Sequence, residues 1–230
     1  AMDSIEGDDR HMSESTRVAF LHTGAVVIAP VAELAREFLP GVDTVNYLDD
    51  RIVADLRDES RAAGVPARVA ELVRAAKTAG ADAVMLTCSS ISQLAVTTAD
   101  EVGIPVLRID EAMADEAVAT GDRIAVLATL PTTLEPTLAL IGERADLAGA
   151  RPTVVSEVID GAFAAVSGGD RASHDRLVAD AISRVAADSD VVVLAQASMA
   201  SAADAAHVDV PVLTSLRPGI QRLRDIVTRS

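Results

Sequence analysis

The chain has 230 residues, of which 50% are hydrophobic, and it carries a formal net charge of −15 at pH 7. Its length suits one or two domains with large aliphatic cores, and the acidic balance argues against nucleic acid and anionic membranes as partners. Aromatic residues make up only 2% of the chain and tryptophan is absent, so stacking platforms for bases or sugars are scarce. No apolar run reaches the roughly 18 residues that a membrane span needs.

The N-terminal residues and the single cysteine bear on where the protein works. Residues 1–12 are polar and acidic without periodicity, and His11-Met12 is typical of a cloning junction, so we interpret them as an expression-tag remnant. No signal peptide is recognisable, and one cysteine excludes an intramolecular disulfide framework. These features predict a cytoplasmic location.

Short apolar runs alternate with helical periodicity through the first half of the chain. Apolar residues at 31, 34, 35 and 38 follow the spacing of a helix that packs on one face. Continuous apolar runs are typical of parallel strands that are buried on both faces. In chain order, strands are predicted at 18–21, 44–48, 83–86 and 105–109, and helices at 31–38, at 69–76, from 88 onward and at 111–119.

Three segments of the first half recur in the same order in the second half. Residues 17–23, 82–90 and 104–107 resemble residues 123–129, 190–198 and 210–213. This repeat predicts an α/β fold of two similar, doubly wound parallel-sheet lobes, 13–121 and 122–230, related by a pseudo-twofold axis. The second lobe is expected to contain a long helix near 178–185, a strand at 191–194, a strand near Val212, and a closing helix at 218–228 that is a candidate for packing on the first lobe.

Small hydroxyl residues, one thiol and one amide follow the predicted strands. Ligands of parallel α/β sheets bind beyond the carboxyl ends of the strands. If the two lobes face each other, these ends converge on one cleft, with Cys88 and Gln196 on opposite walls. The candidate site residues are His22, Thr23, Cys88, Ser89, Ser90, Thr129, Thr132, Thr133, Gln196, Ala197 and Ser198.

Cys88, the only cysteine, stands between a predicted buried strand and the start of a predicted helix. Unpaired amides and the helix dipole favour an anion there, so the thiol is expected to ionise readily and to react. The alternative is a cysteine that packs as a small apolar side chain. Ser89 and Ser90 are either N-cap residues of that helix or donors to a substrate carboxylate, and one hydroxyl can serve as both.

The polar residues at the other strand ends have similar alternatives. Thr129, Thr132 and Thr133 either bind a substrate carboxylate, together with helix N-terminal amides, or cap the helix near 134–140. His22 is either a structural hydrogen-bonding group or a base. The histidines at 174 and 207 fall outside the strand ends and are predicted to lie on the surface.

Several cofactor signatures are missing from the sequence. No glycine-rich phosphate loop follows a strand, no His/Cys/Asp cluster has metal-ligand spacing, and no Gly-x-Ser-x-Gly elbow is present. Lys77, the only lysine, falls in the middle of a predicted helix, which argues against a pyridoxal Schiff base. The sequence therefore predicts a site without a metal or an organic cofactor.

The duplicated lobes, the Leu86-Thr87-Cys88-Ser89-Ser90 segment and residues 104–113 resemble the aspartate/glutamate/hydantoin racemase superfamily, to which arylmalonate decarboxylase and maleate cis-trans isomerase are related. The resemblance implies a pyridoxal-independent isomerase that holds a small carboxylate between its lobes. It makes Cys88 the first-lobe acid/base, Ser89 and the three threonines carboxylate-binding groups, and His22 and Thr23 pocket residues. Superfamily members are often dimers, so a homodimer is an expected assembly.

Gln196 departs from the pattern of two-thiol racemases, in which one cysteine removes the α-proton and another delivers a proton to the opposite face. A neutral amide cannot exchange protons on the second face. Three hypotheses follow: a one-thiol decarboxylase, isomerase or lyase; a racemase whose second base is Ser198, His22 or water; and an inactive protein that binds a small acid. We expect cofactor-independent proton transfer at Cys88 on a small carboxylic or amino acid.

Overall fold

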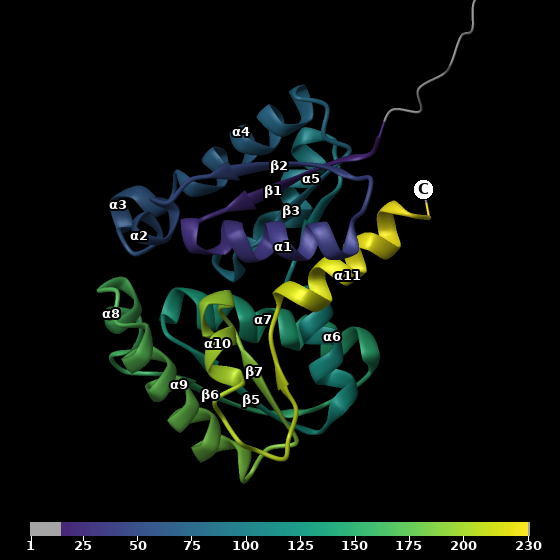
Figure 1. Cartoon of the computed structure of the whole chain (residues 1–230). Coiled ribbons are helices and arrows are strands. Elements are labelled where there is room, and N and C mark those ends of the chain that lie inside the picture. Colours follow the sequence, from purple (N-terminus) through teal and green to yellow (C-terminus); the bar gives the residue numbers. More distant parts are fainter. Residues whose placement is uncertain (1–14, 230) are drawn as a thin grey trace, which may run out of the picture.

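The computed structural model describes residues 15–229, so the interpretation of residues 1–12 as a tag remnant lies outside the described residues. Two lobes stack on each other, and each contains a four-stranded parallel sheet with helices on both faces (Figure 1). The strand orders are β2-β1-β3-β4 and β6-β5-β7-β8, so the second sheet repeats the first. The fold class predicted from the sequence is therefore confirmed.

The first sheet comprises β1 (Arg17–His22), β2 (Asp43–Leu48), β3 (Ala83–Leu86) and β4 (Val106–Arg108). The second comprises β5 (Arg123–Ala128), β6 (Thr153–Val158), β7 (Val191–Leu194) and β8 (Val212–Leu213). The helices up to β5 are α1 (Ile28–Phe38), α2 (Ile52–Leu56), α3 (Glu59–Ala62), α4 (Val65–Thr78), α5 (Ala95–Val102) and α6 (Glu111–Thr120). Those after β5 are α7 (Pro131–Ala148), α8 (Ala162–Ser167), α9 (Arg171–Ala186), α10 (Ala200–Ala203) and α11 (Leu216–Val227). Short 3-10 helices follow β1, β3 and β7, namely η1 (Ala25–Val27), η2 (Ser89–Leu94) and η3 (Ala197–Met199).

The elements that the sequence did not reveal are those without a clear period. β6 is an edge strand whose first four residues are exposed on both faces, and α2, α3, α8 and α10 contain only four to six residues each. The helix predicted from residue 88 onward was also wrong in its first part. This segment begins as the six-residue 3-10 helix η2, and the α-helix starts only at Ala95.

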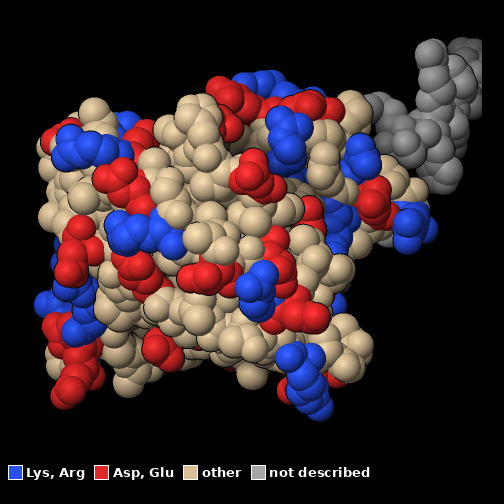
Figure 2. All heavy atoms as spheres, turned by 90° about the horizontal axis from the view of Figure 1, so that it is seen from below, with Lys and Arg blue, Asp and Glu red and all other residues tan. Residues whose placement is uncertain are grey.

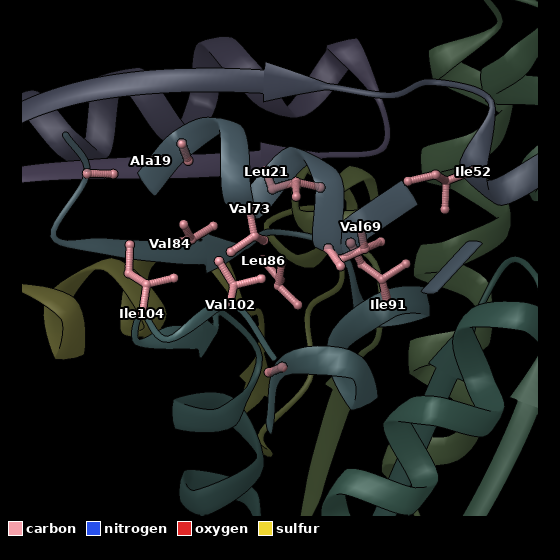
Figure 3. Close-up of a cluster of buried hydrophobic side chains, with 14 of the residues drawn as sticks. Ala19, Leu21, Ile52, Val69, Val73, Val84, Leu86, Ile91, Val102 and Ile104 are labelled. Carbon is pink, nitrogen blue, oxygen red and sulfur yellow. The ribbon is translucent and has the colours of Figure 1, made fainter. Parts of the chain in front are cut away.

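Aliphatic side chains cover both faces of each sheet. On one face of the first sheet, Leu21, Val84 and Leu86 pack in one cluster with Val69 and Val73 of α4 (Figure 3). The buried residues of α4 fall on one side of the helix, as its amphipathic spacing requires. Each fully buried Val or Leu stabilises the fold by roughly 1.5–3 kcal/mol. This core fixes the strands whose carboxyl ends form the site.

The last helix of each lobe packs on the sheet of the other lobe. α11 follows β8, yet its Ile220 and Leu223 lie in the same buried cluster as Phe20 of β1, and Figure 1 shows α11 beside α1. α6 follows β4, yet its Met113 packs in one cluster with Val126 of β5. The sequence suggested the crossing of α11 but not that of α6. The two crossings tie the lobes into one body.

Ion pairs join the two crossing helices to their neighbours. Asp115 of α6 binds Arg222 of α11 at 2.7 Å and Arg144 of α7 at 2.5 Å, and Arg108 of β4 binds Glu143 of α7 at 2.8 Å. Partly exposed pairs of this kind are each worth only about 0–1 kcal/mol. They therefore orient the crossing helices more than they stabilise them, and the apolar clusters carry the interaction.

His174 lies in the core, so the prediction that it is a surface residue was wrong. It shares the buried face of α9 with Val178, Ala181 and Ile182, which follow it at helical spacing. Its Nδ1 lies 2.8 Å from the carboxylate of Asp175. A residue that lies outside the strand ends can therefore still be buried, if it belongs to the apolar stripe of a helix. The histidine at 207 is exposed.

The surface mixes charges of both signs. Figure 2 shows the molecule from below, on the side of the second lobe, where Lys and Arg side chains are interspersed with Asp and Glu. Neither sign forms a continuous field on this face. Among residues 15–229, no helix is long and apolar enough to cross a membrane.

Candidate active site

The carboxyl ends of the two sheets open onto one cavity of about 400 Å³ that is lined by residues of both lobes. This volume falls in the range of small-molecule sites, roughly 300–1,000 Å³. The segments after β1, β2 and β3 form the first-lobe wall, and those after β5, β6, β7 and β8 form the second-lobe wall. The residues named from the sequence that line the cavity are Thr23, Cys88, Ser89, Ser90, Thr133, Gln196, Ala197 and Ser198.

Cys88 is the second residue after β3 and lies half-buried in the first-lobe wall. Its backbone is extended, with φ −127° and ψ 127°, and it is the N-cap residue of η2. Because η2 is a short 3-10 helix, the aligned dipole at Cys88 is smaller than that of the α-helix expected from the sequence. Within residues 15–229 the thiol has no hydrogen-bond partner. Cys88 packs in part against the aliphatic cluster of the first lobe, and it also lines the cavity, where it can meet a bound molecule.

The hydroxyls of Ser89 and Ser90 join the two lobes beside the thiol. Ser89 Oγ donates to the carbonyl oxygen of Ala195 at 3.0 Å, and Ser90 Oγ lies 3.2 Å from Thr133 Oγ1. The hydroxyl proton of Ser89 is thus already engaged by the protein. The Ser90–Thr133 pair has two protons and one mutual hydrogen bond, which leaves one proton for a ligand.

Gln196 has in the second lobe the place that Cys88 has in the first, because each is the second residue after its central strand, β7 or β3. Its Oε1 accepts hydrogen bonds from the backbone N–H of Thr129 at 2.5 Å and from the Thr129 hydroxyl at 2.9 Å. Thr129 itself is buried outside the cavity wall. Its two donors hold Gln196 in place instead of facing the cavity.

Thr132 also lies outside the cavity wall. Its Oγ1 is buried and has no hydrogen-bond partner in the described part of the chain. The threonines do not cap α7 either, because the N-cap residue is Leu130 and it makes no side-chain capping hydrogen bond. Of the three threonines named from the sequence, only Thr133 reaches the cavity.

His22 is buried behind the cavity wall, in a chain of hydrogen bonds that ends at the exposed residue Asn46. Its Nδ1 lies 2.7 Å from Thr87 Oγ1, and its Nε2 lies 2.7 Å from Asn46 Oδ1. Burial lowers the pKa of His22, although the Asn46 hydrogen bond raises it. Thr87 Oγ1 also donates to the carbonyl oxygen of Leu21 at 3.1 Å, so its single proton is engaged there. His22 thus reaches the cavity only through Thr87, which lines it.

Asp110 is a buried carboxyl group behind η2 that the sequence did not single out. It is 1% exposed, and its Oδ1 accepts a hydrogen bond from the Ser92 hydroxyl at 2.7 Å. Burial raises the pKa of Asp110, while the hydrogen bond from the Ser92 hydroxyl lowers it. Because Asp110 is the N-cap residue of α6, it anchors the Cys88 segment to the start of the crossing helix.

Part of the cavity wall is apolar and comes from elements that the sequence did not predict. Val26 of η1, Val53 of α2 and Phe163 of α8 line it, and the two charged lining residues, Asp50 and Arg57, have opposite signs. Val53 and Phe163 follow the corresponding edge strands β2 and β6, so a closer search of the repeat could have found them. The cavity therefore combines polar strand ends with apolar walls.

Metal-ligating side chains do not gather at the cavity. Within residues 15–229, no group of three or more His, Cys, Asp or Glu side chains is placed to hold a metal ion. The polar groups that line the cavity are hydroxyls, one thiol, one amide and the charged side chains of Asp50 and Arg57. Such a set can bind an anion and move a proton.

Solved structures share this fold at low sequence identity. Allantoin racemase from Klebsiella pneumoniae is similar with a TM-score of 0.72 at 20% identity, covering 94% of this chain and 89% of that one. Glutamate racemase from Francisella tularensis, in complex with D-glutamate, is similar with a TM-score of 0.73 at 15% identity, covering 94% and 82%. Arylmalonate decarboxylase is similar with a TM-score of 0.56 at 20% identity, covering 90% and 92%. These likenesses show the fold alone.

The match to a protein family covers most of the chain. A comparison with curated protein sequences finds no match. The family described as Asp/Glu/hydantoin racemase, however, matches residues 21–223, which include both walls of the cavity. The resemblance seen in the sequence is confirmed, and the chain belongs to the Asp/Glu/hydantoin racemase family.

Proposed function

We propose that the chain is a racemase- or isomerase-type enzyme that moves a proton at a carbon of a small carboxylic or amino acid. In this proposal Cys88 is the single catalytic thiol and no cofactor is needed. The supporting observation is that the only cysteine of the chain lines the cavity at the end of a central strand, in a family of racemases. A thiolate can act as a base, and the thiol that results can return the proton.

Hydroxyl groups around the cavity are available to bind the carboxylate of the substrate. Thr23, Ser198 and Ser215 line the cavity, and their hydroxyls have no hydrogen-bond partner within residues 15–229. The Ser90–Thr133 pair has one further proton to donate. Such donors also stabilise the charge that develops on the carboxylate oxygens when the α-carbon loses its proton.

Proton transfer with one thiol balances without a further reactant. The Cys88 thiolate takes the α-proton, and the electrons of the C–H bond pass into the carboxyl group to form an enediolate. The thiol then returns a proton, or a deuteron after exchange with solvent, to the same carbon. Because one thiol serves one face, racemisation also requires Ser198 or a water molecule to deliver a proton to the opposite face of the carbon. Without that second donor, the hydrogen exchanges and the configuration is kept.

A one-thiol decarboxylase is a second candidate, and Gln196 favours it because an amide cannot serve the second face. A malonate-type substrate would lose CO₂, and the electrons of the broken C–C bond would form the enediolate. The Cys88 thiol would protonate that enediolate on one face, and water would reprotonate the thiolate. The product is then a single enantiomer.

Proton NMR in D₂O tests both candidates on a panel of small amino, hydroxy and arylmalonic acids, with the wild type and Cys88→Ala side by side. We expect deuterium uptake or CO₂ loss that falls by roughly 10²–10⁴-fold in the variant. The chirality of the product separates racemisation from one-face protonation. Equal rates in both proteins would contradict the proposal. An acid that raises the melting temperature but is never transformed would indicate a binding protein.

A further inference from the structure

The hydrogen bonds of Gln196 fix which end of its amide faces the protein. The backbone N–H of Thr129 can only donate, and it lies 2.5 Å from the amide atom that it contacts. That atom must therefore be the oxygen, and the Thr129 hydroxyl, 2.9 Å away, donates to the same atom. Two donors from one residue occupy both lone pairs of Oε1. If the amide were flipped by 180°, its –NH₂ group would face the backbone N–H of Thr129, and two donors would be placed against each other.

The other end of the amide has no partner in the protein. Gln196 is half-buried and lines the cavity, and its Nε2 contacts no acceptor within residues 15–229. A fixed –NH₂ group has two donors and no lone pair to offer. The amide of Gln196 is therefore available to donate N–H groups to an oxygen atom in the cavity.

We propose that Gln196 is a catalytic residue that binds a carboxylate oxygen of the substrate through Nε2, and that it takes this role at the position matching Cys88. This inference rests on the proposed function. When Cys88 removes a proton or CO₂ departs, negative charge grows on the carboxylate oxygens, and a donor that is already oriented stabilises it without reorganisation. The pseudo-symmetric position thus holds an oxyanion donor instead of a second base.

Thr129 has a defined part in this arrangement as a positioning residue. It keeps the donors of Gln196 pointed away from the protein, although it lies outside the cavity wall itself. Thr129→Val removes the hydroxyl but leaves the backbone N–H. We therefore expect a smaller loss from Thr129→Val than from a change at Gln196, mostly in kcat rather than in KM.

Gln196→Glu tests the proposal because it keeps the shape and the oxygen that Thr129 binds but replaces the N–H donors by an oxygen. We expect Cys88-dependent exchange or decarboxylation to fall by about 10²–10³-fold, the usual loss for one oxyanion donor. Gln221→Glu adds the same charge on α11, outside the residues that line the cavity, and is the matched control. Gln196→Met, which adds no charge, should lose activity as well. Unchanged turnover in both Gln196 variants, folded by circular dichroism, would overturn the proposal.

Binding of phenylacetate, measured by calorimetry, separates this proposal from the proposed function. Phenylacetate has a carboxylate for the polar strand ends and a ring for the apolar wall. We expect Gln196→Glu to weaken its binding at least tenfold, and Gln221→Glu to leave it unchanged. That result supports the role of Gln196 even if no acid on the panel is transformed. Equal binding by wild type and Gln196→Glu, or no binding by either, would overturn it.

Discussion

The two lobes have the same sheet and different chemistry at its edge. β1 pairs with β3 as β5 pairs with β7, in matching register. Beyond the paired residues, the first lobe continues with Thr87 and Cys88, and the second with Ala195 and Gln196. One wall therefore presents a thiol that can exchange a proton, and the other presents an amide that cannot.

The difference extends behind the cavity wall. In the first lobe a hydrogen-bonded chain runs from the buried residues Thr87 and His22 to Asn46, which is exposed. The corresponding strand positions of the second sheet hold Ser156 and Ala128, which cannot form such a chain. Strand pairing and aliphatic packing have thus kept the duplicated scaffold, while its strand ends have become chemically unlike. The fold alone does not say what either wall does.

Placing a thiol on the second-lobe wall is expected to have the largest effect, because both walls could then exchange a proton. We expect Gln196→Cys to exchange protons on both faces, so that a product formed by wild type as one enantiomer becomes racemic. Chiral chromatography after reaction in D₂O measures this outcome. Titration with a thiol reagent is the control, because it should count two accessible thiols per chain instead of one. A product that stays enantiopure with both thiols present would contradict one-face chemistry.

The second largest effect is expected from removing His22, the central residue of the hydrogen-bonded chain behind the first-lobe wall. We expect His22→Ala, which copies the alanine at the end of β5, to lower the free energy of unfolding by about 2–4 kcal/mol. The variant leaves a cavity and deprives Asn46 and Thr87 of their partner. Urea unfolding followed by circular dichroism measures the change. A loss below about 1 kcal/mol would mean that the hydrogen bonds of His22 do not hold the strand ends.

The pH dependence of the same variant sharpens this test. Burial lowers the pKa of His22 below its ordinary value of 6.5, so the unfolded chain takes up a proton before the folded chain does. Stability from this group is fully present above about pH 6.5 and is lost as the pH falls toward the lowered value, by at most about 1.4 kcal/mol per unit. The stability gap between wild type and His22→Ala should shrink from pH 7.5 to 5.5, and a constant gap would contradict this.

The two crossing helices, α11 and α6, differ in the residues that they place against the other lobe, and we expect a smaller effect from changing this contact. A Cβ atom added to Gly219 of α11 would lie 2.3 Å from the carbonyl oxygen of Ile109, whereas α6 presents Met113 and Ala117 to the second sheet. We expect Gly219→Ala to destabilise the fold by about 1–3 kcal/mol in urea unfolding. Gly142→Ala in α7 is the control, because nothing lies within 4 Å of its added Cβ. If both variants gained stability, α11 would not be packed this closely.

Much of the fold could be predicted because the apolar runs and their repetition in the second half are visible in the sequence itself. The central strands end near the predicted positions, and the rule that ligands bind at carboxyl ends placed Cys88, Gln196 and Thr133 at one cavity. The rule identifies the edge of the sheet where ligands bind, but it does not say in which direction each side chain on that edge points. His22 and Thr129 belong to that edge yet lie one layer behind the cavity.

The rest of the site depends on contacts between distant parts of the chain. Ser89 donates to Ala195, more than a hundred residues away, and no local pattern announces that bond. Val53 and Phe163 lie on short helices that show no period. The buried position of Asp110 likewise arises where η2 meets the start of α6.

The exchange of α6 and α11 also constrains how such a molecule can arise. A half-length chain with one sheet and one exported helix would, as a monomer, expose an apolar sheet face and an apolar helix face. Two copies that traded their last helices would cover both faces, so we expect a half-length chain of this design to assemble as a swapped dimer. Joining the two copies end to end makes the swap intramolecular. In a joined chain the two lobes have separate sequences, so one can contain a thiol where the other contains an amide.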